Sequence, residues 1–253
     1  MRSNKNKIVI ITGVRGGIGR ATAKVFKEEN WYVIGIDIKK KANFPFVDEF
    51  YSIDISKDEE LKKFCVLISK KHNTLNAIIN NAAIQIPKAI TDLTIEDWDK
   101  TFVTNVKPVF LLAKLLYPLL RKGKASIVNI SSVHAVATSK NISAYVASKG
   151  AVLALTRAMA LEFAKDNIRV NTILPGAVDT SMLRAGLNRG HLRGNDLQEQ
   201  IKELSQRIPL GRIGKAEEIA RTISFLADNK RSSFTTGQAI VIDGGAIAKL
   251  STE

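Results

Sequence analysis

The fold is decided near the N-terminus by the stretch Lys7-Ile8-Val9-Ile10-Ile11-Thr12-Gly13-Val14-Arg15-Gly16-Gly17-Ile18-Gly19. Its first part is apolar and rich in β-branched residues, which favours a buried strand. The glycines allow a tight turn, and residues 20–27 have the amphipathic pattern of a helix. Strand, glycine loop and helix in this order predict a dinucleotide site, where free N–H groups at the helix N-terminus hold a pyrophosphate. The loop residues expected to line this site are Gly13, Arg15, Gly17, Ile18 and Gly19.

The second predicted strand, residues 31–37, ends in a carboxylate. Asp37 lies 18 residues after Gly19, close to the separation of about 20 typical of the acid that binds the adenosine ribose. Its charge favours NAD over NADP, because a carboxylate repels a 2′-phosphate and Ile38 offers that phosphate no cation. Arg15 is the opposing signal, since a guanidinium in the glycine loop can reach a 2′-phosphate. We therefore expect NAD as the cofactor, with NADP less favoured.

Tyr145 and Lys149 stand four residues apart in helix-forming sequence, so they share one helix face. The ammonium favours the phenolate, and we expect it to lower the pKa of Tyr145 from its ordinary value of roughly 10. Such a tyrosine can exchange a proton with an alcohol or carbonyl oxygen. A lone pair of this kind is usually a solvated helix face. Ser132 strengthens the prediction, because it follows a predicted strand at the sheet edge where open α/β sheets bind ligands.

Seven apolar segments alternate with helical patterns along the chain. The strands are expected near 7–12, 31–37, 49–54, 76–81, 125–131, 168–174 and 238–243. This alternation predicts an α/β fold, a doubly wound parallel sheet with helices on both faces. At 253 residues, one domain is sufficient.

The ordered motifs of the whole chain resemble those of the short-chain dehydrogenases/reductases. Besides the glycine loop, they include Asn80-Asn81-Ala82-Ala83, Pro175-Gly176 and Val241-Ile242-Asp243-Gly244-Gly245. The resemblance implies a Rossmann fold and an oxidoreductase that interconverts an alcohol and a carbonyl. The catalytic residues that it implies are Asn105, Ser132, Tyr145 and Lys149, with Ser132 preceding Tyr145 by 13 residues as the family pattern requires.

The same resemblance implies a role for each of these residues. Tyr145 transfers the proton, Ser132 steadies the reacting oxygen, Lys149 holds the nicotinamide ribose, and Asn105 anchors a relay water. Further cofactor contacts are implied for Asp54, Ile55, Asn81, Ala82, Ala83, Pro175, Gly176, Val178 and Thr180. Ala83 replaces the usual glycine, and we expect no positive φ there. Pro108 is expected to disturb the helix begun at Thr94, either as a kink that suits the relay water or as a bend without a role.

The substrate is the least determined part of the prediction. The candidate pocket residues, besides Ser132 and Tyr145, are Gln85, His134, Asn141 and Met182. Their polar members favour a hydroxylated substrate, and Lys140-Asn141 resembles sugar 1-dehydrogenases of the family. Residues 181–208 are expected to form a lid, whose arginines either attract an anion or form a solvated face. The alternatives are an NADPH-dependent 3-oxoacyl-carrier-protein reductase and, in a different class, a non-catalytic nucleotide-binding sensor or scaffold.

The composition is typical of a soluble globular chain, with 45% apolar and 25% charged residues. The net charge of +14, from 38 Lys and Arg against 24 Asp and Glu, comes from scattered lysines without interleaved aromatics, so specific nucleic-acid binding is not expected. No metal site and no membrane span are expected either, and the location expected by default is cytoplasmic. The resemblance implies a homotetramer, with contacts through helices near 95–121 and 144–165 and through residues 234–245.

Overall fold

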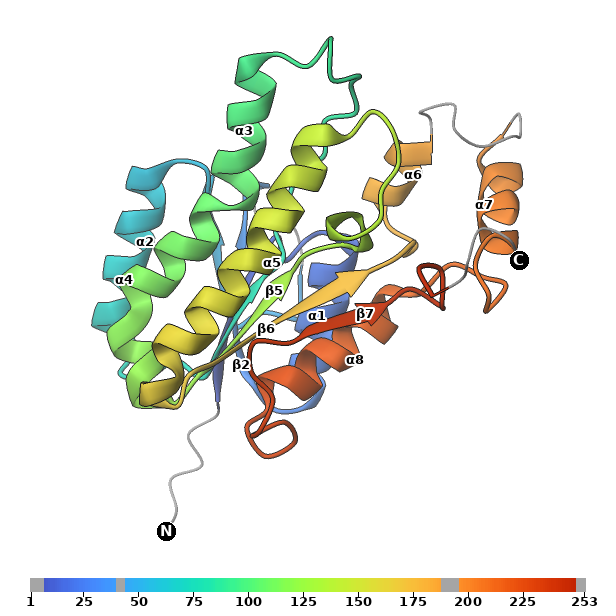
Figure 1. The fold of residues 1–253 in the computed structure, drawn as a ribbon. Helices are drawn as coiled ribbons and strands as arrows, with labels where there is room; N and C mark the ends of the chain where they lie inside the picture. Colours follow the sequence, from blue (N-terminus) through green and yellow to red (C-terminus); the bar gives the residue numbers. More distant parts are fainter. Residues whose placement is uncertain (1–6, 40–43, 188–195, 249–253) are drawn as a thin grey trace.

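The computed structural model describes residues 7–39, 44–187 and 196–248. They build one parallel sheet with the strand order β3-β2-β1-β4-β5-β6-β7 (Figure 1). The strands are β1 Ile8–Thr12, β2 Tyr32–Asp37, β3 Glu49–Ser52, β4 Ala77–Asn80, β5 Ser126–Ile130, β6 Arg169–Pro175 and β7 Ala239–Ile242. Every neighbouring pair is parallel, which confirms the predicted doubly wound sheet.

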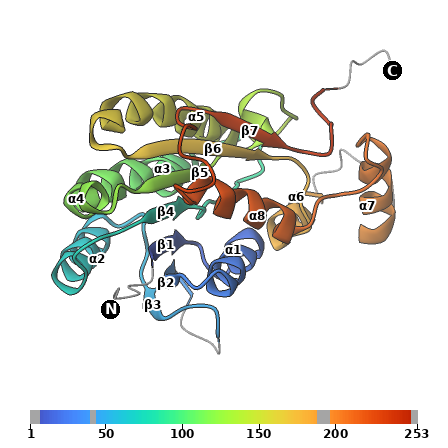
Figure 2. The same cartoon turned by 90° about the horizontal axis from the view of Figure 1, so that it is seen from below.

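Helices cover both faces of this sheet (Figure 2). One face carries α1 Gly17–Glu28 and α8 Ala216–Ala227, and the other carries α2 Asp58–Lys71, α4 Lys107–Gly123 and α5 Ser143–Phe163. The remaining helices are α3 Ile95–Asn105, α6 Ser181–Leu187, α7 Leu197–Gln206 and the short 3₁₀ helices η1 Val133–Ala135 and η2 Ala164–Asp166.

Two apolar clusters, one on each face, form the core. Ile10, Ile78 and Ile127 belong to the cluster under α2, α4 and α5, whereas Val9 and Val128 belong to the cluster under α1 and α8. Successive strand residues point to opposite faces, so a strand buried on both faces needs apolar residues at nearly every position. This explains the continuous apolar runs from which the strands were predicted.

The long apolar stretch Ile95–Gly123 has the length and composition of a membrane span. In the structure it is two helices, because the chain departs from helical geometry at Val106, with φ −113° and ψ −55°. Pro108 lies in the first turn of α4, where a missing N–H is tolerated. The buried leucines of α4, among them Leu112 and Leu116, pack into the core. The interruption expected from Pro108 is therefore present and directly follows Asn105.

Candidate active site

The glycine loop joins β1 to α1 beside the point where the strand order reverses, between β1 and β4. Gly13 has φ +64°, and a Cβ there would lie 2.8 Å from the Cα of Ala82. A Cβ on Gly17 would lie 2.6 Å from Thr180 Cγ2, and one on Gly19 would lie 2.2 Å from the Gly13 carbonyl oxygen. The loop therefore depends on glycine and leads directly into the N-terminus of α1. In open parallel sheets, a glycine loop and helix N-terminus at a topological switch point are where the pyrophosphate of a dinucleotide binds.

Asn81 fixes the glycine loop rather than pointing away from it. Its Nδ2 donates to the carbonyl oxygens of Thr12 and Gly13, both at 3.0 Å. In return, Thr12 Oγ1 accepts from the backbone N–H groups of Asn81 and Ala82, both at 3.0 Å. Ala83 is not among the residues with positive φ, so alanine replaces the family's glycine there without backbone strain, as expected.

The Asp37 carboxylate lies at the end of β2 and is held from two sides. Its Oδ2 accepts from the backbone N–H of Arg15 at 2.9 Å, and its Oδ1 accepts from that of Lys39 at 3.0 Å. Ile38 projects into solvent and is 65% exposed. The carboxylate is thus fixed beside the glycine loop, where a second lone pair on each oxygen can accept a ribose hydroxyl.

The other predicted cofactor positions lie on the loops that follow β3 and β6. Asp54 Oδ1 accepts from the N–H and the hydroxyl of Ser56, at 3.0 and 2.7 Å, whereas the Ile55 side chain is buried in the core. Pro175 ends β6, and the Gly176 N–H donates to Ile242 O at 2.9 Å. Val178 forms a bridge with Gly214, and Thr180 approaches Gly17. The loop after β6 therefore approaches the glycine loop.

Ser132, Tyr145 and Lys149 meet at the carboxyl end of β5. All three are buried, with 6%, 7% and 3% of their surface exposed. A hydrogen bond joins the side chains of Ser132 and Tyr145. Lys149 Nζ lies 5.6 Å from the centroid of the Tyr145 ring and donates to Ile130 O at 2.7 Å. The serine at the end of β5 and the tyrosine and lysine of α5 thus form one buried cluster.

Comparison with known proteins agrees with this arrangement. A family model described as "Enoyl-(Acyl carrier protein) reductase" matches residues 13–246. The 3-oxoacyl-[acyl-carrier-protein] reductase FabG of Thermotoga maritima is 34% identical over 254 residues, which cover 96% of this chain and 98% of that protein. This chain belongs to the short-chain dehydrogenase/reductase family.

Two further members are similar over nearly the whole chain. The NAD-dependent glycerol dehydrogenase of Listeria innocua is 32% identical over 251 residues, covering 96% of this chain and 95% of that protein. The solved structure of the aldohexose dehydrogenase of Thermoplasma acidophilum has a TM-score of 0.89 and 32% identity, over 97% of this chain and 96% of that chain. The present chain is accordingly an oxidoreductase of this family that acts on CH–OH groups.

The electrostatics of this dehydrogenase/reductase site differ from the expectation in one respect. Burial raises the pKa of Tyr145, and the hydrogen bond with Ser132 lowers it without cancelling the rise. Burial also lowers the pKa of Lys149 to about 8. The predicted lowering of the pKa of Tyr145 by Lys149 was therefore wrong for this structure. The reason is geometric: Nζ lies over the ring of Tyr145 and its hydrogen bond goes to Ile130 O.

Asn105 connects the segment after β4 to α5. Its Nδ2 donates to Ile84 O at 2.9 Å and to Ser148 Oγ at 3.0 Å, and its Oδ1 accepts from Ile84 N at 2.8 Å. Ser148 Oγ in turn donates to Tyr145 O at 2.7 Å. Both amide protons of Asn105 are thus in use. A relay water at this residue, as the family resemblance implies, would have to donate a hydrogen bond to Asn105.

Of the predicted substrate contacts outside the catalytic cluster, His134 touches it directly. Its backbone N–H donates to Ser132 Oγ at 3.2 Å, and its ring centroid lies 6.1 Å from that of Tyr145, edge to face. Gln85 follows Ile84, the residue that Asn105 hydrogen-bonds. Asn141 lies just before α5 and has φ +66°, and Met182 belongs to α6. Their roles stay predictions.

The expected lid over 181–208 is described only in part. Its described elements are α6 and α7, whereas 188–195, which include Arg189 and Arg193, lie outside the described residues. Arg184 pairs with Asp179 at 2.9 Å. The lid itself remains a prediction.

Two serines had no predicted role: one belongs to α5, which carries Tyr145 and Lys149, and the other donates a hydrogen bond to α5. One is Ser148, which joins Asn105 to the Tyr145 carbonyl. The other is Ser131, whose hydroxyl donates to Lys149 O at 2.8 Å. The sequence shows Ser131 only as the neighbour of Ser132. The family spacing selects Ser132 and gives no sign of what the hydroxyl before it contacts.

Proposed function

We propose that this chain is an NAD-dependent dehydrogenase that interconverts a hydroxyl and a carbonyl group on a small polyhydroxylated substrate, a sugar or a polyol. The observation that carries the cofactor choice is the Asp37 carboxylate, fixed at the end of β2 by the N–H groups of Arg15 and Lys39. A carboxylate held there accepts the hydroxyls of an unmodified ribose and repels a 2′-phosphate.

The buried cluster supplies the proton chemistry. When bound, the nicotinamide ring accepts or returns the hydride. In the oxidising direction, Ser132 Oγ donates a hydrogen bond to the substrate oxygen while the deprotonated form of Tyr145 takes the hydroxyl proton, so that the carbinol carbon can release its hydrogen as hydride. Because burial raises the pKa of Tyr145, this oxidation is expected to become faster as the pH rises. In the reducing direction, Tyr145 returns the proton to the carbonyl oxygen. Burial of both residues excludes water from the reacting oxygen.

A neutral substrate is supported by the pairing of three cations in the segments that follow β4 and β6. Lys88 pairs with Asp97, Arg184 with Asp179 at 2.9 Å, and Arg212 with Glu218 at 2.6 Å. These cations are already neutralised by carboxylates, so they offer little attraction to an anion. His134, beside Tyr145, adds a group able to hydrogen-bond a second hydroxyl. The named activities of two relatives, a glycerol dehydrogenase and an aldohexose dehydrogenase, support the same substrate class.

The second candidate is an NADPH-dependent 3-oxoacyl-carrier-protein reductase. It is supported by the similarity to FabG and by Arg15 in the glycine loop. The third candidate, a non-catalytic nucleotide sensor, is not favoured, because the catalytic side chains are assembled in one buried cluster.

The test measures turnover with NAD and with NADP over aldoses, polyols and 3-hydroxyacyl thioesters. NAD-dependent oxidation of an aldose or polyol is expected, and Asp37→Ser should shift the preference toward NADP. NADP-dependent turnover of the thioester alone would reject the proposal in favour of the carrier-protein reductase.

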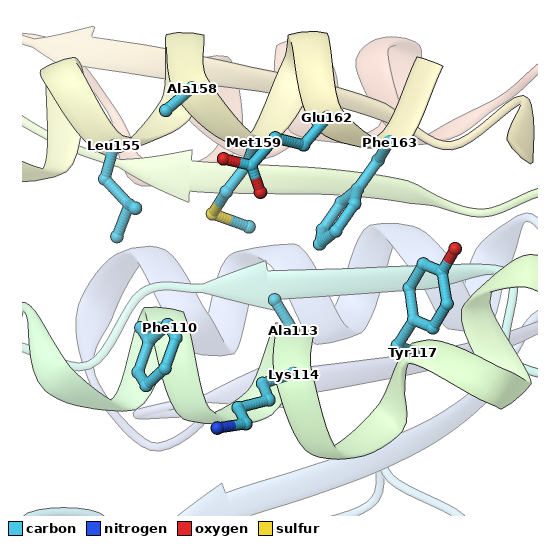
Figure 3. A pocket seen from close by; sticks show the side chains of 9 residues that line it. All are labelled: Phe110, Ala113, Lys114, Tyr117, Leu155, Ala158, Met159, Glu162 and Phe163. Carbon is cyan, nitrogen blue, oxygen red and sulfur yellow. The ribbon is translucent and has the colours of Figure 1, made fainter. Parts of the chain in front are cut away.

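The assembly and the location belong to the same proposal. We expect a homotetramer in the cytoplasm, with the lid at residues 181–208 over each site. The assembly is supported by an apolar groove of about 470 Å³ between α4 and α5, lined by residues of both helices (Figure 3). Phe110 and Leu161, at 46% and 81% exposure, add apolar surface to these two helices.

A further inference from the structure

Lys149 is held at both of its ends by the carboxyl end of β5. Its side-chain Nζ donates to the Ile130 carbonyl oxygen at 2.7 Å, and its own carbonyl oxygen accepts from Ser131 Oγ at 2.8 Å. Ser131 is 2% exposed, and its backbone N–H donates to Ile173 O of β6 at 2.9 Å. The two hydrogen bonds run in opposite directions between the same two segments. Together they fix the position of α5 along its helix axis relative to the end of β5.

This axial position of α5 matters because the reacting groups lie on the two segments that the hydrogen bonds join. Ser132 directly follows Ser131, and Tyr145 lies one helical turn before Lys149 on the same face of α5. A shift of α5 along its axis would therefore change the distance between the Ser132 and Tyr145 hydroxyls. Misplacement of reacting groups by about 1 Å can lower a rate by roughly 100-fold.

We propose that Ser131 is a positioning residue for the reaction: its hydrogen bond to the Lys149 carbonyl oxygen sets the alignment of Ser132 with Tyr145. Ser131 does not touch the reacting oxygen, and its own hydroxyl is occupied by Lys149. This inference rests on the proposed dehydrogenase function, in which Ser132 and Tyr145 bind the same substrate oxygen.

The test compares Ser131→Ala with Ser126→Ala. Ser126 is also buried on β5 and also donates one bond to a carbonyl oxygen, that of Leu226, at 2.8 Å. Each variant loses one buried hydrogen bond, so the stability losses should be similar, at roughly 1 kcal/mol. Two quantities are measured in each: kcat with KM for NAD, and the pKa of Tyr145 from NMR titration of ¹³C-labelled tyrosine, with Tyr145→Phe identifying the resonance.

For Ser131→Ala we expect kcat to fall by about 10- to 100-fold while KM for NAD stays within about twofold. The pKa of Tyr145 should rise above that of the wild type, because the Ser132 hydrogen bond that lowers it is weakened. Ser126→Ala should match the wild type in both. If Ser131→Ala does not fold, Ser131→Cys is measured instead, since a thiol is close in size but a weak donor.

The outcomes separate the two proposals. If both variants behave like the wild type in kcat and in the pKa of Tyr145, the positioning role is overturned. If the wild type oxidises none of the substrates, but the pKa rises in Ser131→Ala alone, the positioning role stands and the proposed function fails.

Discussion

Tyr145 is the residue on which the proposed chemistry depends most directly. Replacing it by phenylalanine removes the hydroxyl and leaves the ring against His134 and Lys149. For Tyr145→Phe we expect kcat to fall by at least about 100-fold, since general acid–base catalysis contributes on that order. NAD affinity, measured by fluorescence titration, should change little. Tyr32→Phe is the control, because it also removes a tyrosine hydroxyl, one that donates to Glu49 at 2.8 Å and lies outside the site. Equal activities of the two variants would rule out Tyr145 as the acid and base.

Lys149 illustrates a cost that the site imposes on the fold. Its pKa is lowered by burial from 10.5 to about 8, so Lys149 binds its proton less tightly in the folded protein than in the unfolded chain. Stability is therefore reduced below pH 8 and recovers as the pH rises from 8 to 10.5. At pH 7, Lys149→Met should raise the free energy of unfolding by on the order of 2 kcal/mol and therefore raise the melting temperature. The same variant should lose dehydrogenase activity. A lower melting temperature of this variant at pH 7 would show that the bond to Ile130 outweighs the burial of the charge.

At the scale of elements, the strands were predictable because burial on both faces leaves a continuous apolar run in each. The apolar pattern does not predict the hydrogen-bond partners of buried hydroxyl groups. Nothing near Ser131 in the sequence indicates that its partner is Lys149, 18 residues later on another element. The direction of the pKa shift of Tyr145 was missed for a related reason. Its burial arises from packing between β5, η1 and α5, which local spacing does not describe.

Two glycines in different elements should respond oppositely to alanine. A Cβ on Gly19 would lie 2.2 Å from the Gly13 carbonyl oxygen, so Gly19→Ala must displace the loop. We expect its KM for NAD to rise at least about tenfold, because a displaced loop no longer fits the pyrophosphate. A Cβ on Gly150 of α5 would meet nothing within 4 Å. Gly150→Ala should therefore stabilise the protein by about 0.5–1 kcal/mol with unchanged kinetics. Equal KM values in the two variants would argue against the predicted role of the glycine loop.

The stability of the β3 edge of the sheet depends on one buried carboxylate. Glu49 of β3 accepts hydrogen bonds from Tyr32 of β2, Tyr51 of β3 and Lys71 of α2, at 2.8, 2.5 and 2.7 Å. Burial alone would raise the pKa of Glu49, but these bonds outweigh it and lower the pKa to about 2. The stabilisation is therefore complete above pH 4.5 and is lost as the pH falls from 4.5 through 2. Acid unfolding of Glu49→Gln, followed by circular dichroism, should show a weaker pH dependence in this range than the wild type, and an unchanged slope would contradict this role.

For the molecule as a whole, the apolar groove and the cluster of Ser132, Tyr145 and Lys149 share no residue. The cluster lies at the carboxyl end of β5, whereas the groove lies between α4 and α5 (Figure 3). The groove carries one cation, Lys114 on α4, and one anion, Glu162 on α5. We expect a second copy to cover this groove, whose lining includes none of Ser132, Tyr145 and Lys149.

The expected assembly has a second face around Phe234, whose side chain is fully exposed. If both faces pair copies of the chain, each can be broken separately. Ala158→Arg places a charged chain in the α4–α5 groove and Phe234→Ser removes the apolar contact of the other face, so each should convert a tetramer to dimers. The double variant should be a monomer. Sedimentation velocity at micromolar concentration measures these states. Ile90→Arg, at an exposed apolar residue that belongs neither to the groove lining nor to residues 234–245, is expected to remain tetrameric. A monomeric wild type would contradict the assembly. Tetramers of Ala158→Arg would remove the groove from it, because a side chain as long as arginine in place of alanine would overpack a closed contact between two copies at α4 and α5.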